Sequence, residues 1–131
     1  MGFYVFYIGA LIIYNLIKRV EAIKTRQIDL RYYKTYANKD GVPEELAVLE
    51  RHVDNQFQVP TIFLVSCTAH LALHQVSTLT VALAWLFVVF RLAHSYIHLG
   101  SNVVLRRAKV YGLGWLALLG LWMELIFAVS A

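Results

Sequence analysis

The chain has 131 residues, of which 60% are hydrophobic and 15% are charged, and its formal net charge is +4. An ordinary soluble domain is about half apolar and about a quarter charged, so this composition excludes an ordinary soluble protein and favours a membrane protein. The length fits a single domain and is too short for a large transporter built from repeats. The one cysteine, Cys67, excludes an intrachain disulfide and a metal site built on paired thiols.

Four apolar segments follow one another along the chain, at about 2–17, 57–76, 79–100 and 110–131. Each is close to the roughly 20 residues that cross a hydrocarbon core of about 30 Å. No charged region precedes the first segment and no small-residue cleavage site follows it, so we interpret it as a retained membrane helix rather than a signal peptide. The sequence predicts one all-α, four-helix transmembrane domain over 1–131, with helices at about 2–25, 43–76, 78–104 and 107–130.

The connection between the first two segments is long and charged, whereas the other two are short. It contains Gly41 and Pro43, followed by Glu44 and Glu45. Proline suits the first turn of a helix, and acidic residues there interact favourably with the helix dipole. We therefore expect the second helix to begin near Pro43, well before its apolar part.

Basic residues gather in two of the three connections. They are Lys18, Arg19, Lys24, Arg26, Arg31, Lys34, Lys39 and Arg51 in or beside the first connection, and Arg106, Arg107 and Lys109 in the third. In a four-helix protein these two connections share one side of the bilayer, which the positive-inside rule predicts to be cytoplasmic. Both termini are then non-cytoplasmic, and the net charge needs no nucleic-acid partner.

A polar stripe interrupts the third apolar segment. Arg91, His94, Ser95 and His98 are spaced i, i+3, i+4 and i+7, which places them on one face of a helix. Such residues do not face lipid, and two roles stay open for them: an interhelical hydrogen-bond network and a ligand-binding site. Two histidines at i, i+4 also suit a metal ion, but no cysteine or acidic residue on that helix completes a ligand set, so no metal site is predicted.

Two further polar features lie in the other helices. Arg51, Asn55 and Gln58 share one face where the second helix enters its apolar part. Glu124 lies deep in the fourth segment, where a pairing with Arg91 and a hydrated position near the far interface both stay open.

These motifs together resemble the MAPEG family, the membrane-associated proteins in eicosanoid and glutathione metabolism. The stretch 51–60, RHVDNQFQVP, is similar to the second-helix signature of the family, which has an Arg, then an Asn, then a Glu three residues later and then a Pro. The third-helix stretch 91–98 and the pair Arg106-Arg107, with Tyr111 one turn on, also resemble the family. The resemblance covers the whole chain.

The resemblance implies a homotrimer of four-helix subunits that binds glutathione between neighbouring subunits, near the cytoplasmic side. Arg107 is then the catalytic residue, which stabilises the glutathione thiolate. The remaining residues implied to bind the cofactor are Arg51, Asn55, Gln58, Arg91, His94, His98 and Tyr111.

The implied function is that of a membrane-bound glutathione transferase or peroxidase, in a bacterial inner membrane, acting on apolar electrophiles that enter from the lipid. The chain departs from the family at Gln58, where a Glu is typical, and at Asp54, where several members have a second Arg. These departures favour an alternative: a non-catalytic subunit that binds a lipid or serves a larger membrane-protein complex.

Overall fold

The computed structural model of the chain describes residues 1–29, 31–35 and 41–130, so that Lys39 of the first basic group lies outside the described residues. Within these ranges the structure is helical, without strands. The elements are α1 (Gly2–Lys24), α2 (Tyr32–Thr35), α3 (Glu44–Gln56), α4 (Val59–Ala72), α5 (Thr78–Leu99) and α6 (Val104–Ser130).

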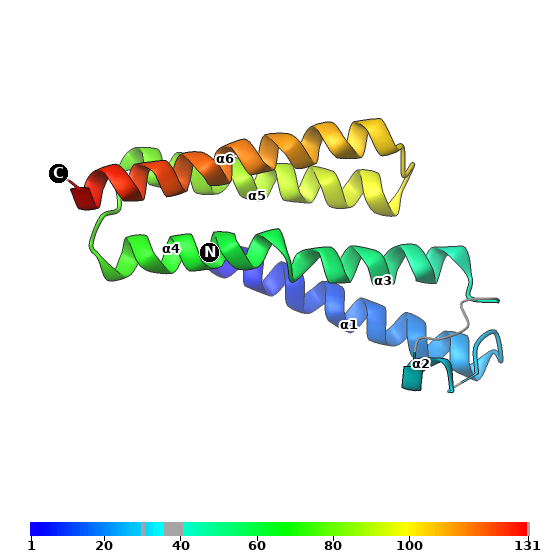
Figure 1. Ribbon diagram of the computed structural model, residues 1–131. Coiled ribbons are helices and arrows are strands. Elements are labelled where there is room, and N and C mark those ends of the chain that lie inside the picture. The colour runs from blue at the N-terminus through cyan, green and yellow to red at the C-terminus, as the bar shows by residue number, and fades with distance from the viewer. Residues whose placement is uncertain (30, 36–40, 131) are drawn as a thin grey trace.

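The helices form a membrane-type bundle (Figure 1). In Figure 1, α5 and α6 lie side by side and antiparallel, α3 and α4 follow each other nearly in line, and α1 runs obliquely along α3. Three helices, α1, α5 and α6, are long and apolar enough to cross a membrane. Their outer faces carry exposed apolar side chains such as Phe6, which is 82% exposed, as contact with lipid requires. The predicted all-α membrane fold is confirmed.

The second predicted helix differs from the expectation of a continuous helix over 43–76. It is divided into α3 and α4, with Phe57 and Gln58 between them. Pro60 stands in the first turn of α4, where a backbone N–H has no partner within the helix, so the lack of an N–H in proline costs no hydrogen bond. Because the ring of Pro60 would clash with the carbonyl oxygen four residues earlier, at Gln56, the first helix cannot continue through Pro60 and a new helix starts.

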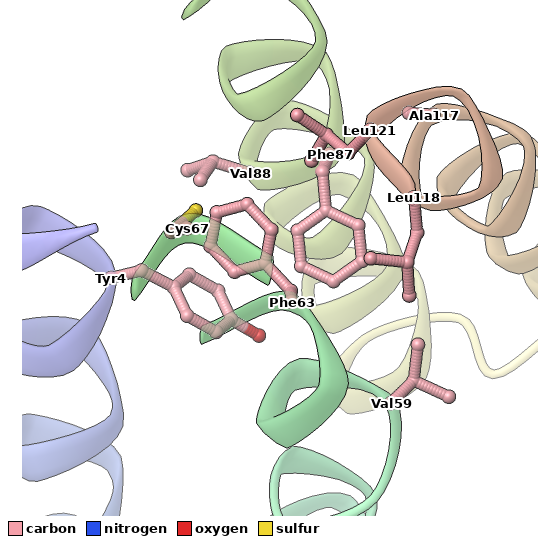
Figure 2. Close-up of a cluster of buried hydrophobic side chains, with 9 residues drawn as sticks. All are labelled: Tyr4, Val59, Phe63, Cys67, Phe87, Val88, Ala117, Leu118 and Leu121. Carbon is pink, nitrogen blue, oxygen red and sulfur yellow. The ribbon is translucent and has the colours of Figure 1, made fainter. Parts of the chain in front are cut away.

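The largest hydrophobic core lies between α1, α4, α5 and α6 (Figure 2). The rings of Phe63 and Phe87 stack with centroids 4.2 Å apart, and Tyr4 meets both rings edge-on at 6.0 and 6.1 Å. Figure 2 shows Leu118 and Leu121 of α6 closing the cluster behind Phe87. Such contacts between aromatic rings add to the burial of area and fix α1 and α4 against the α5–α6 pair.

Candidate functional site

Arg91 lies at the centre of a buried polar cluster, with 1% of its surface exposed. Its Nη2 donates to the carbonyl oxygen of Asn55 at 3.1 Å and to Oε1 of Gln56 at 3.3 Å, and its Nε donates to the Tyr4 hydroxyl at 3.5 Å. Its Nη1 is buried and has no hydrogen-bond partner among the described residues. No carboxylate of residues 1–29, 31–35 and 41–130 forms an ion pair with it. The guanidinium is therefore balanced by dipoles rather than by a counter-ion.

Gln56 joins Arg91 to the first helix and to a histidine. Its Oε1 also accepts a 2.6 Å hydrogen bond from the Tyr4 hydroxyl, and its Nε2 lies 3.1 Å from Nε2 of His52. Because an amide NH₂ group only donates, His52 accepts at Nε2. Burial, reinforced by the nearby His98, His94 and Arg91, lowers the pKa of His52 to about 3. His52 in α3 is thus a neutral acceptor at physiological pH.

A second connection runs through Tyr7 of α1. Its hydroxyl donates to Oγ of Ser95 at 2.6 Å, and Ser95 donates to the carbonyl oxygen of Arg91 at 2.9 Å. The cluster therefore links α1, α3 and α5 through side chains that lie far apart in the sequence. Lipid offers no hydrogen-bond partners, so these polar groups must find them within the protein.

The histidines of the predicted stripe lie beside His52. The centroids of the His52 and His98 rings are 5.0 Å apart, and those of His94 and His98 are 5.6 Å apart. The ring centroid of Tyr111, in α6, lies 5.7 Å from the ring centroid of His94. The same centroid of Tyr111 lies 5.7 Å from Cζ of Arg91. The structure thus brings together four of the predicted site residues: Arg91, His94, His98 and Tyr111.

Three predicted residues of the second helix make no side-chain hydrogen bond to this cluster in the described part of the chain. Arg51 is exposed and its Nε donates to the carbonyl oxygen of Ala47, one turn earlier. Gln58 is exposed at the N-terminus of α4, and Asn55 is half-buried and reaches Arg91 only through its backbone carbonyl.

The predicted catalytic residue, Arg107, is held by the turn between α5 and α6. Its Nη1 donates to Oδ1 of Asn102 at 2.8 Å, and the residue is half-buried. Asn102 has a φ of 47°, in the left-handed region that asparagine tolerates, and its N–H donates to the carbonyl oxygen of Ile97 at 2.7 Å. Among the described residues no carboxylate forms an ion pair with Arg107, so its charge is fixed in position and uncompensated.

A cleft of about 590 Å³ opens at this end of the bundle, between the C-terminal part of α1, the start of α3 and the α5–α6 turn. Its walls include His98 of the polar cluster and Asn102, the partner of Arg107, together with charged residues of α1 and α3. This volume is within the range of about 300–1,000 Å³ typical of small-molecule sites.

Sequence reasoning missed Tyr4, Tyr7, His52 and Gln56, which carry most of the cluster's hydrogen bonds. A signal for them exists, since His52 and Gln56 are spaced i, i+4 and Tyr4 and Tyr7 are spaced i, i+3. These pairs mark the inner faces of α3 and α1.

Glu124 is not a partner of Arg91. It accepts a hydrogen bond from the hydroxyl of Ser77, in the α4–α5 connection, and its Oε2 lies 3.9 Å from Nε2 of His70. Of the two possibilities left open by the sequence, the structure excludes the pairing with Arg91 and places Glu124 at the end of the bundle away from the basic connections, where Ser77 and His70 are its neighbours.

Comparison with protein families gives a match to the model described as the MAPEG family, over residues 1–127. No curated protein and no solved structure matches the chain. The matched region includes all the residues of the polar cluster, the Arg107 turn and nearly all of α6, and it confirms the resemblance found in the sequence. The chain is a member of the MAPEG family.

Proposed function

We propose that the protein is a membrane-bound transferase or peroxidase that uses glutathione and acts on apolar electrophiles arriving from the lipid. Membership of a family associated with glutathione and eicosanoid metabolism supports this proposal. The observation that carries it is Arg107, a guanidinium oriented by Asn102 and left without a carboxylate partner among the described residues.

A fixed, uncompensated cation is what activation of a thiol requires. The thiolate is the nucleophilic form, and a free thiol has a pKa of about 8.5. A positive charge within about 4–6 Å lowers such a pKa by about 1–3 units. Arginine stays charged throughout this range, so Arg107 supplies the charge and the cofactor supplies the sulfur.

We further propose that the protein is a homotrimer in a bacterial inner membrane, with its basic end in the cytoplasm. Arg51 and Gln58 are exposed, so their side chains are available to a neighbouring subunit. In the proposed site these residues hold the peptide part of glutathione, while Arg107 of an adjacent subunit faces the sulfur.

The proposal is tested by calorimetric titration of glutathione into the detergent-purified full chain. Arg107→Ala is compared with Arg106→Ala. Arg106 is the exposed neighbour of Arg107, so its replacement removes the same charge from the same turn. We expect saturable binding by the unchanged protein and by Arg106→Ala. In Arg107→Ala, the ultraviolet absorbance of bound thiolate should be lost below pH 8, because the thiol pKa returns toward about 8.5.

The same titration decides the alternative role. Asp54 is exposed beside Asn55, and its negative charge repels the carboxylates of glutathione. Trimers that assemble correctly but bind no glutathione at millimolar concentration would refute the enzyme proposal and favour a non-catalytic, lipid-binding or accessory subunit.

A further inference from the structure

The cleft of about 590 Å³ beside the α5–α6 turn carries more negative than positive charge in its walls. Figure 1 shows that the end of α1, the start of α3 and the α5–α6 turn lie at the same end of the bundle. The charged residues that line the cleft are three carboxylates, Glu21, Glu44 and Glu45, and one ammonium group, Lys18. This acidic lining stands out at an end of the bundle where basic residues prevail.

The single ammonium group does not balance the three carboxylates. Nζ of Lys18 lies 2.9 Å from Oε2 of Glu21 and also interacts electrostatically with Glu45, so the α1 and α3 walls are within range of each other. Glu44 and Glu45 are exposed, and neither forms an ion pair in the described part of the chain. Both stand in the first turn of α3, where the helix dipole supplies only roughly half a positive charge. The cleft therefore keeps an excess of negative charge, which suits a cation.

A buried histidine also lines the cleft. His98 is 3% exposed, and its side chain makes no hydrogen bond to another of the described residues. Its Nδ1 is fully buried, whereas Nε2 is not, so Nε2 is the ring nitrogen that a ligand in the cleft can reach. An imidazole nitrogen donates or accepts according to its tautomer, and a hydroxyl group can do either. A ligand hydroxyl would therefore supply the hydrogen bond that His98 lacks.

The remaining walls of the cleft include apolar side chains, among them Leu46, Leu49 and Leu99. We propose that the cleft binds a small cationic amphiphile, an amino alcohol with an apolar body. Its ammonium group pairs with Glu44 and Glu45, and its hydroxyl group forms a hydrogen bond with Nε2 of His98. The volume is within the range of about 300–1,000 Å³ that holds such molecules.

The test compares three water-soluble probes of one shape. Tyramine has both an amine and a hydroxyl group, phenethylamine lacks the hydroxyl, and 4-ethylphenol lacks the amine. Binding to the full chain in an uncharged detergent is measured by equilibrium dialysis against empty micelles. Glutathione is left out, so that failure here leaves the glutathione proposal untouched.

We expect tyramine to bind most tightly. Loss of the amine should weaken binding about tenfold, because a charge-assisted hydrogen bond is lost, and loss of the hydroxyl about fivefold. Raising the salt concentration should weaken both amines but not 4-ethylphenol, because salt screens exposed charges. Equal affinities of tyramine and 4-ethylphenol would overturn the proposal.

Two pairs of variants locate the site. Glu45→Gln should remove most of the advantage of tyramine over 4-ethylphenol, whereas Asp54→Asn, which removes the same charge from the other end of α3 and outside the cleft, should retain it. His98→Phe should abolish the preference for tyramine over phenethylamine, whereas His74→Phe, exposed at the far end of the bundle, should not. Because Glu45 is exposed, its replacement leaves the fold intact, and unchanged binding in Glu45→Gln would refute the site even if His98→Phe failed to fold.

Discussion

Replacing Gln56 by leucine tests how far the buried polar cluster stabilises the bundle. Gln56 is 1% exposed and makes three side-chain contacts, with the Tyr4 hydroxyl, Arg91 Nη2 and His52 Nε2. Leucine keeps much of the volume but leaves all three groups without this partner. Hydrogen bonds between membrane helices contribute about 0.6 kcal/mol on average and about 1.7 kcal/mol at most. Three of them predict a loss of about 2–5 kcal/mol in the free energy of unfolding.

The assay is reversible unfolding of the purified protein in mixed micelles with increasing SDS, followed by circular dichroism. Gln58→Leu is the matched control, because Gln58 is two residues away and exposed, and its loss should change the free energy of unfolding by less than about 0.5 kcal/mol. If Gln56→Leu also stayed within about 0.5 kcal/mol, the cluster would not stabilise the fold and our account of Arg91 would be wrong.

Two further predictions concern the turn before Arg107 and the α3–α4 junction. A Cβ at Gly100 would lie 2.9 Å from a backbone oxygen one turn earlier, so Gly100→Ala should lower the free energy of unfolding by about 1–3 kcal/mol in the same SDS titration. A Cβ at Gly112 would meet nothing within 4 Å, so Gly112→Ala should raise the free energy of unfolding by about 0.5–1 kcal/mol. Equal effects of the two changes would contradict the steric argument. Gln58→Glu restores the charge typical of the family, so calorimetry should show glutathione binding about tenfold tighter, because a carboxylate pairs with the glutathione amine more strongly than an amide does. Gln75→Glu adds the same charge at the far end and should have no effect; a gain there would point to nonspecific electrostatics.

The α5 stripe shows what periodicity predicts well. The spacing of Arg91, His94 and His98 places them on one face, and the structure buries all three. Polar residues that are expensive in lipid must point inward, so the pattern alone decides their direction. Their partners were not predictable in the same way, since Tyr4 lies 87 residues from Arg91 and no local pattern reports such a contact.

On α3 the same method selected the outer face. Arg51 and Asn55 share a helical face, but so do His52 and Gln56, and the structure buries the second pair. Leu46, Leu49 and Val53 lie on the same side of α3 as His52 and Gln56 and are buried with them, so the spacing of these apolar residues indicates the inner face, which the choice of Arg51 and Asn55 passed over. The break before α4 was readable in principle, because Pro60 suits the first turn of a helix and cannot stand in a helix interior without a clash.

The division between α3 and α4 also has a consequence for the surrounding lipid. At 1.5 Å per residue, the 14 residues of α4 rise about 21 Å, whereas the hydrocarbon core of a bilayer is about 30 Å thick. The neighbouring α5 and α6 have 22 and 27 residues and match the full thickness. One side of the bundle therefore presents a hydrophobic mismatch, which a bilayer relieves by thinning locally or by the helix sinking toward one leaflet. The size of this mismatch depends on the thickness of the membrane, and it affects the protein at the α3–α4 junction, which carries Gln58.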